Sequence, residues 1–150
     1  MARVLKRPGD IFQVPLSGDR HGYAQWLPDG TARIFLVSTS TPLSISDICA
    51  RDVAFRVIVF KDTPGRYGWI KVGKAEIPSG CSLPQRYAKK DRLSGALALY
   101  VEGVETPAST DELKGLETLA VWAHPHIVER LESQLAGRVS SFARSIAIAT

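Results

Sequence analysis

The stretch that decides the fold is Tyr23-Ala24-Gln25-Trp26-Leu27-Pro28-Asp29-Gly30-Thr31-Ala32-Arg33-Ile34-Phe35-Leu36-Val37. Two apolar arms flank its Pro-Asp-Gly segment, in which the proline presets φ, the aspartate bonds to nearby backbone and the glycine tolerates positive φ. The stretch therefore predicts a β-hairpin with strands over residues 23–27 and 31–37.

Strand patterns continue on both sides of this hairpin. Residues 10–16 alternate apolar and polar side chains, which predicts a half-buried strand whose proline lies at an edge or bulge. Residues 53–60 are rich in β-branched and aromatic side chains, so we expect a central strand covered on both faces. Residues 67–73 predict another strand, with Tyr67 and Trp69 turned toward the core.

The patterns beyond these strands are more mixed. Residues 43–50 fit a short helical turn or an irregular strand, and residues 78–93 are basic and loop-like. Residues 96–101 and 116–122 are apolar enough to be strands.

Two segments carry helix signals. A capping box over residues 109–112 permits a helix over residues 111–118, as an alternative to a strand there. The clearest helix follows Pro125 and stops at Gly137. Its apolar stripe consists of Ile127, Val128, Leu131 and Leu135, and the side chains predicted to point outward are Glu129, Arg130, Glu132 and Gln134.

Length and composition indicate one ordinary folded domain. The chain has 150 residues, of which 45% are hydrophobic and 23% are charged, which excludes disordered, collagen-like and disulfide-stapled classes. We expect a single α+β domain over residues 1–150, built on a strongly twisted, mainly antiparallel sheet or partial barrel of about six to eight strands with a C-terminal helix. The tail over residues 138–150 receives no structural assignment.

Charge is unevenly distributed along the chain. The net charge of +4 and the sequence pI near 9.3 are mildly basic. Residues 61–92 carry eight basic and three acidic side chains, whereas residues 102–132 carry seven acidic and two basic ones. The chain is therefore a charge dipole in sequence, and either sign could face a partner.

Each charged segment has a functional and a structural interpretation. The basic candidates for a nucleic-acid surface are Arg66, Lys71, Lys74, Arg86, Lys89 and Lys90. The acidic candidates, which could imitate phosphates before a basic nuclease site, are Asp111, Glu112, Glu117, Glu129 and Glu132. Solvated faces of strands and helices are the structural interpretation of both patterns; the period-two spacing favours it for the basic segment, whereas spacing does not decide for the acidic one.

Signals for catalysis, metals and export are weak. His124 and His126 flank a proline, a spacing that does not place both rings on one helix face, and the structural role of a helix start competes with a hydrolase role. Cys49 and Cys81 lack metal-binding or redox spacing, so we expect packed, reduced thiols and no metal or cofactor. No export signal or membrane-length apolar run is visible, which predicts a cytoplasmic protein without membrane contact.

Particular residues also resemble a known family. The opening Arg7-Pro8-Gly9-Asp10-Ile11-Phe12-Gln13-Val14-Pro15-Leu16, followed by Gly22-Tyr23-Ala24, is similar to the start of the immunity protein 26 family found beside bacterial polymorphic toxins. Gly65-Arg66-Tyr67-Gly68-Trp69-Ile70-Lys71-Val72-Gly73 resembles that family's tryptophan-glycine strand, and residues 119–122 leading to residues 126–131 agree as well. The likeness runs from Lys6 to Gly137 and departs from the family pattern at residues 24–27.

The resemblance implies a small non-enzymatic protein that binds a cognate toxin domain and occludes its active site, and the acidic pattern suits a toxin that is a nuclease. Such a protein protects the cell that makes the toxin, including in contact-dependent inhibition systems. We expect the acidic candidates to face the toxin, and we regard nucleic-acid binding through the basic candidates as the alternative function.

Overall fold

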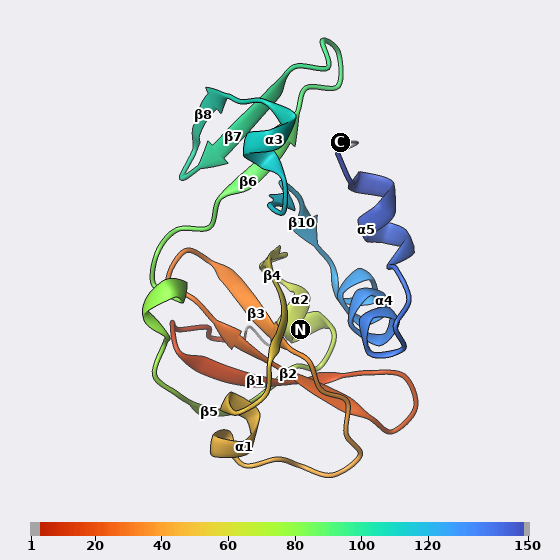
Figure 1. Cartoon of the computed structure of the whole chain (residues 1–150). Coiled ribbons are helices and arrows are strands. Elements are labelled where there is room, and N and C mark those ends of the chain that lie inside the picture. The colour runs from red at the N-terminus through yellow and green to blue at the C-terminus, as the bar shows by residue number, and fades with distance from the viewer. Residues whose placement is uncertain (1–3, 149–150) are drawn as a thin grey trace.

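The structure is a computed structural model that describes residues 4–148, whose strands form one six-stranded and one four-stranded sheet (Figure 1). The larger sheet has the order β10-β4-β3-β2-β1-β5, and all its pairs are antiparallel except β10 with β4. Its strands are β1 (Asp10–Pro15), β2 (His21–Trp26), β3 (Thr31–Phe35), β4 (Val53–Val59), β5 (Ile70–Lys74) and β10 (Val121–Trp122).

The predicted hairpin is confirmed as β2 and β3, and its turn has the expected chemistry. Asp29 Oδ1 accepts hydrogen bonds from the Thr31 backbone N–H at 3.1 Å and from the Thr31 hydroxyl at 2.5 Å. Gly30 adopts a φ of 81°, a conformation that glycine reaches without steric cost. The predicted strand over residues 10–16 is likewise confirmed, as β1.

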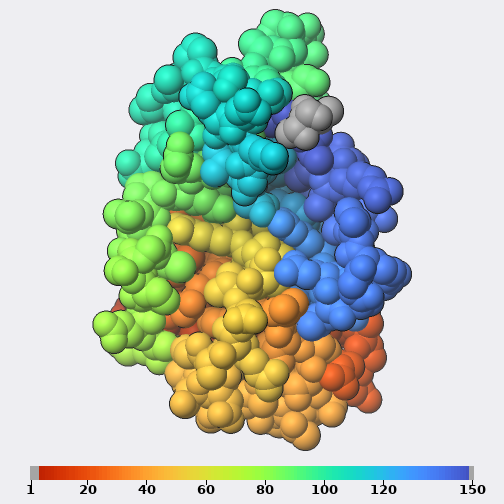
Figure 2. All heavy atoms as spheres, in the orientation of Figure 1, coloured from red at the N-terminus to blue at the C-terminus, as the bar shows by residue number. Residues whose placement is uncertain are grey.

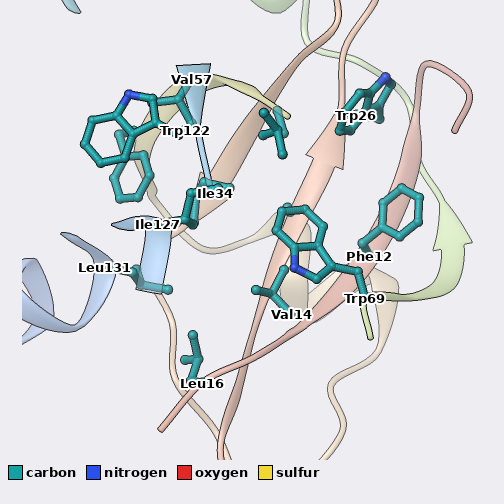
Figure 3. Close-up of a cluster of buried hydrophobic side chains, with 14 residues drawn as sticks. Phe12, Val14, Leu16, Trp26, Ile34, Val57, Trp69, Trp122, Ile127 and Leu131 are labelled. Atoms are coloured by element: carbon teal, nitrogen blue, oxygen red, sulfur yellow. The ribbon is translucent and has the colours of Figure 1, made fainter. Parts of the chain in front are cut away.

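Apolar side chains cover both faces of β1, so the expectation of a half-buried strand is wrong. Phe12 and Val14 belong to the main cluster, which also contains Trp122 (Figure 3). Ile11 belongs to a second cluster with Ile48 of α1 (Ile45–Cys49). Alternate residues of a strand point to opposite faces, and α1 covers the face that the sequence pattern left open to solvent.

The strand predicted over residues 53–60 is β4, but it is buried on one face only. Phe55, Val57 and Val59 are buried, whereas the alternate residues Ala54, Arg56 and Ile58 stay partly exposed. Arg56 interrupts the apolar run, and its guanidinium donates hydrogen bonds to Thr31 and Asp29 outside the main cluster.

The strand predicted over residues 67–73 begins later, at Ile70. The preceding residues form the short helix α2 (Thr63–Arg66), with Pro64 in its first turn, and Gly68 with a φ of 72° redirects the chain. Trp69 is buried as expected and Tyr67 is half-buried, both before the strand rather than in it.

The smaller sheet has the order β8-β7-β6-β9 and lies beyond one end of the larger sheet (Figure 1). Its strands are β6 (Tyr87–Lys90), β7 (Leu97–Val101), β8 (Val104–Pro107) and β9 (Glu117–Thr118). The prediction of a loop over residues 78–93 is therefore wrong for the residues of β6. The short helix η1 (Ser79–Cys81) precedes that strand. The strand predicted over residues 116–122 divides into β9 and β10, which belong to different sheets.

The helices agree with the sequence signals more closely. The capping box is present at Ser109 and Glu112, but its helix α3 (Thr110–Leu113) is shorter than the alternative over residues 111–118 because Gly115 adopts a φ of 80°. The predicted long helix is α4 (His124–Leu135), and the unassigned tail contains α5 (Ser141–Ile146).

Helix α4 packs on the main cluster through two fully buried side chains, Ile127 and Leu131, whereas Leu135 is 42% exposed. The molecule therefore has the α+β architecture that the sequence predicts, with open, mainly antiparallel sheets and C-terminal helices. None of the helices within residues 4–148 combines the length and apolar character needed to cross a lipid bilayer.

Candidate functional site

A polar network joins the β2–β3 turn to the segment that leads into the smaller sheet. Asp29 Oδ2 accepts hydrogen bonds from Arg56 Nη2 at 2.9 Å and from the Gln85 backbone N–H at 3.0 Å. The Gln85 side chain donates to the Arg56 carbonyl at 2.8 Å, and Arg56 Nη2 also donates to the Leu83 carbonyl. Burial alone would raise the pKa of Asp29, but the hydrogen bonds from Thr31 and Gln85 and the Arg56 charge hold it below its ordinary value.

An open groove lies beside this network, and we call it the amino-terminal groove. It has a volume of about 1060 Å³. Its lining comes from the chain before β1, the ends of β2 and β4, and β10, and includes Leu5, Lys6, Trp26, Ile58, Phe60 and Val121. Three of these apolar side chains are well exposed: Leu5 at 58%, Phe60 at 47% and Val121 at 43%.

Phe60 lines the amino-terminal groove, and both of its backbone polar groups are hydrogen-bonded. Its backbone N–H donates to the Trp122 carbonyl at 3.1 Å, and its carbonyl accepts from the Thr63 N–H at 3.0 Å. Lys6 reaches across the groove, where its amine donates to the Lys61 carbonyl at 2.8 Å and lies 5.5 Å from the Trp26 ring centroid. The groove thus offers a fixed, mainly apolar surface with charged groups at its rim.

The acidic candidates are used mainly for contacts within the chain. Glu117 forms a two-pronged ion pair with Arg130, with N–O distances of 2.8 and 2.6 Å. Glu129 accepts from the hydroxyl of Ser140 and from the next backbone N–H, which fixes the start of α5.

Two further acidic candidates also have intramolecular partners. Glu132 accepts from the Ser17 hydroxyl at 2.7 Å, and Glu112 belongs to the capping box of α3. Glu129 and Glu132 share a small hollow of about 490 Å³, whereas Asp111 and Glu112 lie on α3 and Glu117 on β9. The sequence expectation that α4 points its charged residues freely outward is therefore wrong for Glu129, Arg130 and Glu132.

The basic candidates are also divided between elements. Arg66 lies on α2, Lys71 and Lys74 on β5, and Lys89 and Lys90 on β6, with Arg86 just before that strand. Lys71 pairs with Asp10 at 2.8 Å, and Lys89 pairs with Glu105. The candidates thus occupy both sheets, and two of them are already neutralised by a carboxylate.

Both candidate histidines pack against aromatic rings. Trp69 Nε1 donates to His124 Nδ1 at 3.0 Å, and the His124 ring stacks on Tyr67 with centroids 4.7 Å apart. Burial lowers the pKa of His124. His126 stacks on Phe142 of α5 at 3.8 Å, so the two imidazoles occupy separate aromatic contacts.

The thiols and the metal-binding residue types form no common site in the described part of the chain. Cys49 is exposed and Cys81 is half-buried, so the expectation of a packed thiol is wrong for Cys49. Residues 4–148 contain no group of three or more histidine, cysteine, aspartate or glutamate side chains arranged to hold a metal ion.

Comparison of the chain with protein-family models, with characterised proteins and with solved structures gives no match. The surface therefore has to be interpreted from its own chemistry. Sequence reasoning missed the amino-terminal groove because its exposed residues Leu5, Phe60 and Val121 come from three distant segments, and each one belongs to an apolar or basic run that has an ordinary structural explanation.

Proposed function

We propose that this protein is an immunity protein, which binds a cognate toxin domain in the cytoplasm of the producing bacterium and occludes the toxin's active site. The observation that carries the proposal is the amino-terminal groove, where Phe60 and its apolar neighbours remain exposed on a rigid backbone. Protein interfaces are anchored by such aromatic side chains, surrounded by apolar and polar neighbours that exclude water.

The resemblance to the immunity protein 26 family supports the same proposal. The residues that carry this resemblance stabilise the fold. Gly9 adopts a φ of 95°, and a Cβ there would lie 3.1 Å from the Ala75 carbonyl oxygen. Asp10 accepts from the Arg7 N–H and pairs with Lys71, which ties β1 to β5. These residues would preserve a scaffold while surfaces such as the groove vary with the toxin.

In this proposal, three of the acidic candidates stabilise the fold and are not assigned to the toxin-binding surface. Glu117, Glu129 and Glu132 hold elements of the protein together, so replacing them would test folding as well as binding. The exposed apolar residues of the groove provide a cleaner test because a polar substitution there removes binding surface without breaking an ion pair.

The test is co-expression with the toxin domain encoded beside the gene. The wild-type protein should restore growth and co-elute with the toxin domain in size-exclusion chromatography. Phe60→Asp should weaken the complex about 30-fold or more, as expected for an interface anchor. Val104→Asp is the matched control, because Val104 is 64% exposed and lies outside the groove.

Unrelieved toxicity and separate elution of the two wild-type proteins would overturn the proposed function. Equal affinity of the Phe60→Asp and Val104→Asp variants would instead remove the groove from the binding surface. Circular dichroism of both variants provides the check that they remain folded.

A further inference from the structure

The loop between β6 and β7, which we call the hairpin tip (residues 91–96), projects from the smaller sheet. It forms an extremity of the molecule in both Figure 1 and Figure 2, where its atoms are green. Leu93 at this tip has 99% of its surface exposed. A single exposed leucine is ordinary in itself, so the surroundings of Leu93 decide whether it has a role.

The backbone of the hairpin tip is fixed by a dense set of hydrogen bonds. Asp91 Oδ1 accepts from the N–H groups of Leu93 at 2.9 Å and Ser94 at 2.8 Å. The Gly95 N–H donates to the Asp91 carbonyl, and the Asp91 N–H donates to the Ala96 carbonyl, both at 2.9 Å. Gly95 has a φ of 74°, which lets the loop close in so few residues. Leu93 is therefore presented by an ordered loop, which lowers the entropy lost on binding.

The charge around the hairpin tip is positive. Lys90 and Arg92 flank Asp91, whose carboxylate accepts hydrogen bonds from the loop backbone and keeps its negative charge, so the three residues carry a net charge of +1. Neither Lys90 nor Arg92 forms an ion pair with any residue of the described chain, whereas Lys89 on the same strand is neutralised by Glu105. The tip thus presents Leu93 directly after Arg92, with Lys90 two residues before Arg92, and both cations are available to a partner.

We infer that the hairpin tip inserts into a carboxylate-lined cleft of the protein partner. Leu93 would fill an apolar recess of that cleft, while Arg92 and Lys90 would pair with its acidic side chains. The inference rests on the proposed immunity function and specifies the partner's chemistry. It selects a toxin whose active site is rich in Asp and Glu, as opposed to the basic nuclease site that the acidic candidates would suit.

The experiment measures affinity for the purified toxin domain encoded beside the gene, at low and at physiological ionic strength. Leu93→Asp and Arg92→Glu should each weaken binding about 30-fold or more. Arg92→Glu should also slow association, with a loss that is larger at low salt because steering by exposed charges is screened. Val104→Asp is the matched control, since Val104 is 64% exposed and lies at the other end of β7, beyond the turn into β8.

The outcomes separate the inference from the function on which it rests. Wild-type affinity in the Leu93→Asp and Arg92→Glu variants, with the complex otherwise intact, would overturn the inference and leave the immunity function standing. Absence of any complex with the wild-type protein would overturn the function itself. Binding of fluorescein-labelled single-stranded RNA and DNA is measured as well. If Arg92→Glu abolishes salt-dependent binding of these nucleic acids but leaves the affinity for the toxin unchanged, the tip is a nucleic-acid contact instead.

Discussion

At the scale of single residues, His124 shows how a polar ring is accommodated beside the main cluster. Its Nδ1 accepts the Trp69 indole N–H, so the neutral ring carries its proton on Nε2. Protonation of Nδ1 would break this hydrogen bond, and burial already lowers the pKa of the ring. The imidazole is therefore a structural acceptor that functions in its neutral form.

A pH dependence of stability follows from this arrangement. The unfolded chain binds a proton at His124 near the ordinary pKa of about 6.5, while the folded chain does so only at lower pH. The contribution of His124 to the free energy of unfolding is thus complete above pH 6.5 and is lost as the pH falls below it. We predict that His124→Gln, which keeps an acceptor but does not titrate, loses less stability than the wild type between pH 7.5 and pH 5. Urea denaturation followed by tryptophan fluorescence measures this difference, and parallel losses in the two proteins would contradict the assignment.

At the scale of elements, Arg130 connects helix α4 to both sheets. Its guanidinium binds Glu117 of β9 with two hydrogen bonds and lies 4.2 Å from the Phe55 ring centroid and 5.0 Å from that of Trp122. Both partners of the ion pair are mostly shielded, with side-chain exposures of 17% and 25%. A planar guanidinium can bond a carboxylate in two places and stack on rings at once, which an ammonium cannot do.

Arg130→Lys is therefore expected to destabilise the protein although it conserves the charge. We predict a loss of about 1–3 kcal/mol in the free energy of unfolding, the range for a hydrogen-bonded charged group that loses its partner geometry. The midpoint of urea denaturation provides the measurement. Lys114→Arg is a suitable control because Lys114 is exposed at the end of α3, and it should leave the midpoint unchanged. A wild-type midpoint for Arg130→Lys would reject the element-joining role.

Local chemistry explains which elements the sequence predicts correctly. The β2–β3 turn depends on Asp29 and Gly30, and α4 depends on the spacing of Ile127 and Leu131, so each signal lies within its own segment. β6 escaped prediction because its second half is Lys89-Lys90, which has the composition of a loop and becomes a strand by pairing with β7. The groove and the hairpin tip could not be predicted, because exposure of Phe60 or Leu93 depends on what the rest of the chain leaves uncovered.

At the scale of the whole molecule, the charge dipole of the sequence is partly cancelled by folding. The basic strand β6 joins the same sheet as the acidic β8, which brings Lys89 to Glu105. The net charge of +4 therefore gives little information about the binding surface, whereas the unpaired cations of the hairpin tip give more. This is why we propose a cationic contact at the hairpin tip, whereas the sequence led us to expect an acidic one.

The two sheets also differ in how they are stabilised, which sets the order in which they open. Among the described residues, neither apolar cluster includes a side chain of β6, β7, β8 or β9, and every residue of β7 is only half-buried. Within residues 4–148, the smaller sheet has only a few buried side chains of its own, Tyr87, Ala88 and Leu113, and the Asp29 network and the Arg130–Glu117 pair attach it to the rest of the molecule. We predict that amide hydrogens of β6 and β7 exchange through a partial opening whose free energy lies below that of β1–β3.

Hydrogen exchange read by mass spectrometry at increasing urea concentrations measures this hierarchy. Gln85→Ala should speed exchange in residues 83–101 several-fold more than in β1, because it removes the side-chain donor to the Arg56 carbonyl and the acceptor of the Tyr87 hydroxyl. Asp47→Ala is the control: Asp47 is exposed on α1, on the side of the larger sheet that the second cluster covers, and should not affect β6. Equal protection of both sheets in the wild type would mean that they unfold as one unit. The hairpin tip would then be as stable as the core, whereas a lower opening free energy would place the tip in the less stable part of the molecule.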